Sequence, residues 1–156
     1  MRNLKKIILI NIAIISLYCI ACKDKKVGPL NTSNIILRDK PLKTIKNYLK
    51  GKWQMHYTIG GISGNQRYSF VNTYLEFTFN ETNNDSIRWH NDTSEMAKDI
   101  VTFERELYIF GPEYTYQINF NTLPTGFQNW VAYSIKDDTL ILTDNSVDGF
   151  AYACTR

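Results

Sequence analysis

The stretch GKWQMHYTI, residues 51–59, decides the fold class of this 156-residue chain. Its large apolar side chains fall on every second position, at Trp53, Met55, Tyr57 and Ile59. Polar residues fill the positions between them. Successive side chains of a β-strand point to opposite faces of a sheet, so this period of two indicates a strand with one buried and one solvated face. We therefore expect an all-β domain that includes this strand.

The same alternation recurs along the rest of the chain. We expect eight strands, over residues 51–59, 73–80, 86–90, 100–110, 113–120, 130–135, 139–143 and 150–155. The segments between them are rich in Gly, Asn, Asp and Pro, and several are too short for a helical crossover. Antiparallel, up-and-down strands are therefore expected, and closure into a barrel is favoured over a sandwich because it leaves no unpaired edge. Pro41 opens a short helical pattern that stops at Gly51, so a helix should precede the first strand.

Leu49-Lys50-Gly51-Lys52-Trp53 resembles the Gly-x-Trp signature that opens the first strand of lipocalins, where a short helix also precedes that strand. The last two predicted strands, ending at Arg156, resemble those of lipocalin-like bacterial lipoproteins. The resemblance covers about residues 47–156 and implies an all-β, eight-stranded, antiparallel, up-and-down lipocalin-like barrel preceded by a short helix. It also implies that Arg156 packs across Trp53 and closes the base of the barrel. An ordinary core position for Trp53 in a β-sandwich is the alternative.

The first residues have the features of an export signal. A basic start is followed by an apolar run from Ile7 to Ala21, which is shorter than the ~20 residues of a membrane-spanning helix. The ending Ile20-Ala21-Cys22 resembles the lipobox of bacterial lipoproteins, with Cys19 where Leu is usual. This resemblance implies lipidation of Cys22 and attachment to the bacterial outer membrane, on its periplasmic or cell-surface face. Ordinary cleavage after Ala21 and an uncleaved anchor are the alternatives.

The predicted organisation is a signal peptide over 1–21, a basic tether over 22–46 and a barrel over 47–156. Residues 1–46 carry ten Lys or Arg against two Asp or Glu, whereas residues 47–156 carry eight against thirteen. The folded part is therefore acidic, which excludes nucleic acid as an expected partner. Contact of the basic tether with anionic phospholipid and a solvated spacer are both compatible with its charge. With Cys22 acylated and Cys19 removed, Cys154 has no partner and no disulfide is expected.

The residues predict neither an enzyme nor a metal or cofactor site. The two histidines, His56 and His90, lie on the polar faces of their strands, and Cys154 lies on an apolar face. Residues 144–149 match the start of an EF-hand loop, but the twelfth position is Thr155 and the flanks are strands. We therefore expect a hairpin loop there rather than a calcium site.

The inward face of the predicted barrel is aromatic, with Arg105 as its single charge. The predicted ligand-binding residues are Tyr57, Arg105, Tyr114, Tyr116 and Tyr133. Tyrosine hydroxyls and a guanidinium among aromatic rings suit an apolar molecule with an anionic head. The expected function is therefore binding of a small hydrophobic or amphipathic molecule in the cell envelope by a membrane-anchored monomer.

A barrel filled by its own side chains is the alternative. Such a protein would instead bind an envelope or host protein through the loops 60–72 and 121–129, which carry Tyr68, Phe70 and Phe127.

Overall fold

A computed structural model of the chain describes residues 34–62, 64, 66–80, 84–92, 94–120 and 129–156. The predictions for the signal peptide, Cys22 and Phe127 lie outside the described residues. The elements are β1 (Ile35–Ile36), α2 (Leu42–Leu49), β2 (Gly51–Gly60), β3 (Gln66–Thr78), β4 (Ser86–Asn91), β5 (Ser94–Ile100), β6 (Thr102–Leu107), β7 (Tyr114–Asn119), β8 (Asn129–Lys136), β9 (Thr139–Asp144) and β10 (Phe150–Thr155). The all-β class and the helix before the first long strand are thus confirmed.

The strands form one antiparallel sheet in the order β5-β4-β3-β2-β10-β9-β8-β7-β6, with β1 added to β8. The prediction of eight strands closed into a barrel is wrong, because the sheet has ten strands and is not closed. The strand expected over residues 100–110 is divided at Val101. Val101 is buried, and its backbone N–H donates to the Asp85 carbonyl at 3.0 Å. Before Val101, β5 pairs with β4; after it, β6 pairs with β7. The two end strands of the sheet, β5 and β6, therefore follow one another in sequence.

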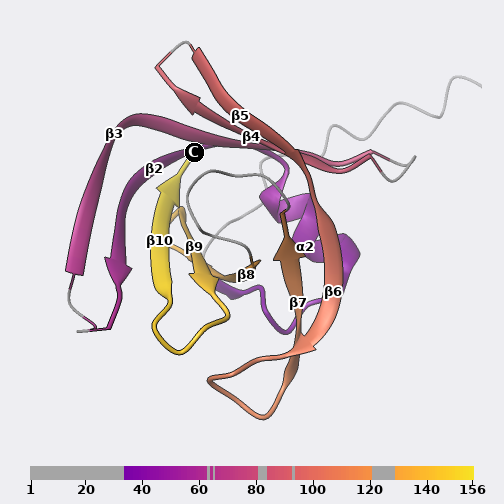
Figure 1. Ribbon diagram of the computed structural model, residues 1–156. Helices are drawn as coiled ribbons and strands as arrows, with labels where there is room; N and C mark the ends of the chain where they lie inside the picture. Colours follow the sequence, from indigo (N-terminus) through magenta and orange to yellow (C-terminus); the bar gives the residue numbers. More distant parts are fainter. Residues whose placement is uncertain (1–33, 63, 65, 81–83, 93, 121–128) are drawn as a thin grey trace, which may run out of the picture. The chain divides into compact units, whose positions relative to one another are not determined.

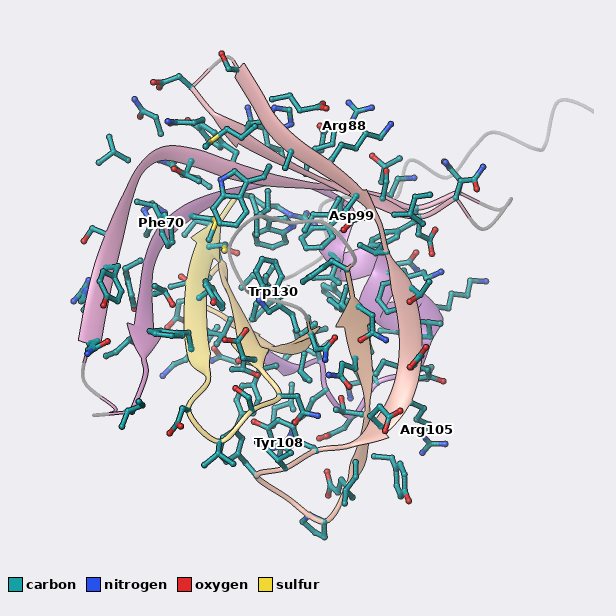
Figure 2. The ribbon with its side chains drawn as sticks, in the orientation of Figure 1. Phe70, Arg88, Asp99, Arg105, Tyr108 and Trp130 are labelled. Carbon is teal, nitrogen blue, oxygen red and sulfur yellow. The ribbon has the colours of Figure 1, made fainter. Side chains whose placement is uncertain are left out.

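Figure 1 shows the sheet curling so that β3, β2 and β10 lie on one side and β7 and β6 on the other. The side chain of Trp130 lies inside this curl (Figure 2) and is fully buried. The core around it consists of aliphatic and aromatic side chains from α2 and most of the strands. Burial of this apolar surface is the main source of stability of the fold.

β-bulges in β2 and β8 change which side chains face the core. In the pairing of β2 with β10, Met55 is opposite Cys154 and Tyr57 is opposite Ala153, so His56 is an extra residue. In the pairing of β8 with β9, Tyr133 is the extra residue between Ala132 and Ser134. An extra residue reverses the alternation beyond it. Thr58 rather than Tyr57 is therefore the buried residue after the first bulge.

Helix α2 covers part of the core through one apolar face. Ile45 and Leu49 are buried, and Lys46 forms an ion pair with Asp85, just before β4. The helix ends at Leu49, because Lys50 already has an extended ψ of 129°; Gly51 follows with a φ of 110°, a conformation that favours glycine. Leu37, between β1 and α2, is fully buried as well. Part of the segment that the sequence assigned to the tether thus belongs to the folded unit.

Candidate functional site

Three of the predicted ligand-binding residues lie around one hollow of the surface. Arg105 on β6 is exposed rather than an inward charge, which corrects the prediction made from alternation. Tyr114 on β7 is 61% exposed, and Tyr116 is half-buried against the core. Together with Arg38, these residues define what we call the arginine–tyrosine depression.

The depression lies where the segment between β1 and α2 meets the β6–β7 hairpin. Arg105 is paired with Tyr116 in the ladder, and its guanidinium carbon lies 6.0 Å from the centre of the Tyr114 ring. A hollow of about 240 Å³ is lined by Arg38, Asp39, Lys40, Pro41, Arg105, Tyr114 and Tyr116. A shallower hollow of about 420 Å³ shares Asp39, Arg105 and Tyr114 with it and adds Pro112 and Glu113.

Arg38 is held in place by its backbone and by its side chain. The backbone N–H groups of Leu37 and Arg38 donate to the Tyr133 carbonyl at 2.9 and 3.2 Å, and the Thr115 hydroxyl donates to the Arg38 carbonyl at 2.9 Å. The guanidinium lies over the rings of Tyr133 and Tyr108, at 5.0 and 5.4 Å from their centres. The guanidinium lies against both rings, whose centres are 6.3 Å apart, and its Nε is 3.3 Å from Asp39 Oδ1. These contacts hold its charge in a fixed position. Sequence alternation missed Arg38 because it follows a short apolar segment outside the predicted strands.

The other two predicted ligand-binding residues lie elsewhere. Tyr133, the bulge residue of β8, contacts Arg38 and contributes with Ile35 and Ile36 to a separate, mainly apolar hollow of about 360 Å³. Tyr57 is half-buried beside β3, with the guanidinium carbon of Arg67 at 4.1 Å from its ring centre. The structure therefore does not gather the five predicted residues in one interior cavity.

The residues predicted to close the base of the fold are in contact. Trp53 is fully buried, and its indole N–H donates to the Leu49 carbonyl at 2.7 Å. The Arg156 guanidinium carbon lies 4.7 Å from the Trp53 ring centre, and Nη2 donates to the Tyr48 carbonyl at 2.8 Å. The last residue of the chain thus joins the end of α2 to the beginning of β2.

A partly buried polar cluster at the end of β9 was not anticipated from the sequence. The Asp144 carboxylate accepts hydrogen bonds from the Phe150 backbone N–H at 3.0 Å and from the Tyr152 hydroxyl at 3.4 Å. Burial raises the pKa of Asp144 above its ordinary value and outweighs these hydrogen bonds. Burial and the nearby Asp144 charge raise the pKa of Tyr152. The cluster joins the two ends of the β9–β10 loop, at the position where the sequence predicted a hairpin loop.

The arginine–tyrosine depression has the chemistry of a reversible binding site. Its lining residues provide three cationic side chains, Arg38, Lys40 and Arg105, against the carboxylates of Asp39 and Glu113. Guanidinium groups bind carboxylate or phosphate oxygens, while tyrosine rings supply apolar faces. Within the described residues, no three His, Cys, Asp or Glu side chains are placed to hold a metal ion. Burial raises the pKa of the Cys154 thiol to about 12, so it remains protonated at neutral pH.

Comparison of the chain with models of protein families, with curated proteins and with solved structures finds no match. Among the described residues, no helix has the length and apolar character needed to cross a membrane.

Proposed function

We propose that this chain is a lipocalin-like lipoprotein, held by lipidated Cys22 at the bacterial outer membrane, that binds a small amphipathic anion in the arginine–tyrosine depression. It acts as a monomeric binding protein rather than as an enzyme. In the sheet, β2 pairs with β10, and β9, β8 and β7 follow β10 in up-and-down order. This order and the contact between Trp53 and Arg156 support the lipocalin-like part of the proposal. The lipobox-like ending at Cys22 supports the anchor.

The observation that carries the binding proposal is the convergence of Arg38, Arg105, Tyr114 and Tyr116 on one hollow of about 240 Å³. An anionic head placed between the two arginines leaves the attached apolar group against the tyrosine rings and Pro41. Tyr114 is 61% exposed, so the bound molecule keeps part of its surface in water. This geometry favours a small amphipathic anion over a long lipid buried in a central cavity.

The test compares decanoate with decanol by isothermal titration calorimetry. The two probes share an apolar chain and differ in the anionic head. We expect decanoate to bind more tightly than decanol, and Arg105→Gln to weaken decanoate binding about tenfold, because one charged hydrogen-bond donor is lost. Arg67→Gln is the matched control, since Arg67 also covers a tyrosine ring but lines neither hollow of the depression. Equal binding of both probes, or equal effects of the two variants, would refute the proposed site.

Binding of a protein partner through the loops is the second candidate function. The β2–β3 hairpin favours it, because Ile62 is 89% exposed, Val71 is 76% exposed and Tyr68 is 54% exposed. Exposed apolar side chains grouped on one hairpin are typical of interaction sites. Affinity capture from envelope extracts should then recover a protein with the wild-type chain and not with Ile62→Ser/Val71→Ser. Equal recovery with both chains would exclude this hairpin as the binding surface.

A further inference from the structure

Charge is divided unevenly within the folded part of the chain. Residues 34–52 carry six Lys or Arg and one Asp, a balance of +5, whereas residues 53–156 carry six Lys or Arg and thirteen Asp or Glu, a balance of −7. The positive residues are therefore concentrated in and around α2, next to the segment that leads to Cys22. Such an asymmetry orients a protein toward an anionic surface.

Helix α2 presents its charge on the face opposite the core. Ile45 and Leu49 are buried, whereas Lys43, Asn47 and Lys50 are exposed. Lys46 lies between the two faces and is engaged by Asp85. Lys43 on α2 and Lys50 directly after it are thus held at a fixed spacing by a helix that the core and an ion pair keep in place.

A groove of about 410 Å³ runs beside this face, between α2 and the residues that follow β3. Its lining consists of Leu42, Lys43, Lys46, Asn47, Lys50, Phe79 and Asn80. The lining contains three lysines and two side-chain amides but no carboxylate, and Leu42 and Phe79 add apolar surface. We call it the lysine groove. Ammonium and amide donors beside apolar side chains match a phosphate joined to a hydrocarbon chain.

We propose that the lysine groove docks the headgroups of anionic phospholipid at the membrane that holds the protein. This inference rests on the proposed lipid anchor. Asn34, the first described residue, lies twelve positions after Cys22 (34 − 22 = 12), so an extended segment spans at most about 40 Å. An anchor on so short a segment keeps the helix near the bilayer at high effective concentration, and weak headgroup contacts are then enough to orient the domain.

Lysine acetylation tests the proposal on the full chain purified from membranes. The protein is reconstituted into vesicles of phosphatidylcholine alone or of equal parts phosphatidylcholine and phosphatidylglycerol, and labelling at each lysine is measured by mass spectrometry. We expect labelling of Lys43 and Lys50 to fall severalfold in the anionic vesicles and to recover in about 0.5 M NaCl, because salt screens exposed charges. Lys98, which is exposed on β5, is the internal control and should keep its labelling.

Charge variants supply the second arm of the test. Each surface lysine near an anionic membrane changes binding about fivefold, so in a Cys22→Ser background, which cannot be acylated, Lys43→Gln/Lys50→Gln should lower co-sedimentation with anionic vesicles by roughly twentyfold. Arg67→Gln/Lys98→Gln removes the same charge at exposed positions outside the groove and should leave it unchanged. Equal labelling of Lys43 and Lys50 in both vesicle types, or equal loss in both variants, would overturn the proposal, as would preferential binding to a soluble acidic polysaccharide. A chain that stays membrane-bound with unprotected lysines overturns the docking alone, whereas one that leaves the membrane at high salt overturns the anchor.

Discussion

The contact between Trp53 and Arg156 gives the sharpest prediction for stability. Trp53→Leu retains apolar volume but removes the indole ring and leaves the Leu49 carbonyl without its donor, so the free energy of unfolding should fall by about 2–4 kcal/mol. Arg156→Ala removes the guanidinium above that ring and the bond to the Tyr48 carbonyl. Because Arg156 is exposed, the expected loss is only about 1–2 kcal/mol.

The two losses should not add, because both variants remove the same cation–ring contact. Urea unfolding of the wild type, both single variants and the double variant should give a coupling energy of about 0.5–1 kcal/mol. Arg67→Ala serves as the control partner, since Arg67 pairs with Ile59 on β2, six residues along the strand from Trp53. Its combination with Trp53→Leu should be additive. Strict additivity for Trp53 and Arg156 would show that the ring and the guanidinium contribute independently.

Three further predictions concern the interior of the fold. The pKa of Asp144 is raised in the folded state, so ionisation of this carboxyl costs stability. As the pH rises from about 4, the pKa of this carboxyl in the unfolded chain, through its folded pKa, the stability of the wild type should therefore fall relative to that of Asp144→Asn. A difference in urea unfolding that does not change with pH would contradict this. Leu37→Ala should lower the free energy of unfolding by about 2–5 kcal/mol, because Leu37 is fully buried. Ile36 is half-exposed, so Ile36→Ala should lower it by less than about 1 kcal/mol. Similar losses for the two variants would place Leu37 outside the core. A Cβ at Gly60 would lie 2.3 Å from a backbone oxygen of the β9–β10 loop, whereas one at Gly64 would meet open space. Thermal unfolding should therefore show a clearly larger loss of stability for Gly60→Ala than for Gly64→Ala.

Alternation predicted which segments are strands more successfully than it predicted where their side chains point. The segment 51–59 is a strand, and Trp53 and Met55 are buried as expected. After His56 the expected side-chain orientation is wrong, because a bulge moves Tyr57 off the buried face of the strand. Tyr133 shifts for the same reason in β8. A bulge depends on the partner strand as well as on its own residues, so a single strand's pattern does not reveal it.

The ends of the sheet were equally hidden from local pattern. Residues 100–110 alternate like one long strand, yet the buried Val101 separates β5, which pairs with β4, from β6, which pairs with β7. Arg38 belongs to the candidate site because β1 adds to β8 at the bulge, a long-range pairing that a two-residue strand does not announce. The contact between Trp53 and Arg156, by contrast, was accessible from sequence because a family resemblance supplied the long-range partner.

The most direct test of the proposed binding site is to locate an anionic amphiphile on the protein. Tyrosines labelled with carbon-13 and assigned by Tyr→Phe substitution report on each ring separately during titration with decanoate. The ring signals of Tyr114 and Tyr116 should shift saturably with decanoate and much less with decanol, while the signal of Tyr57, beside Arg67, should not change. Saturable shifts at Tyr57 with unchanged Tyr114 and Tyr116, or no shifts at any tyrosine, would contradict the account.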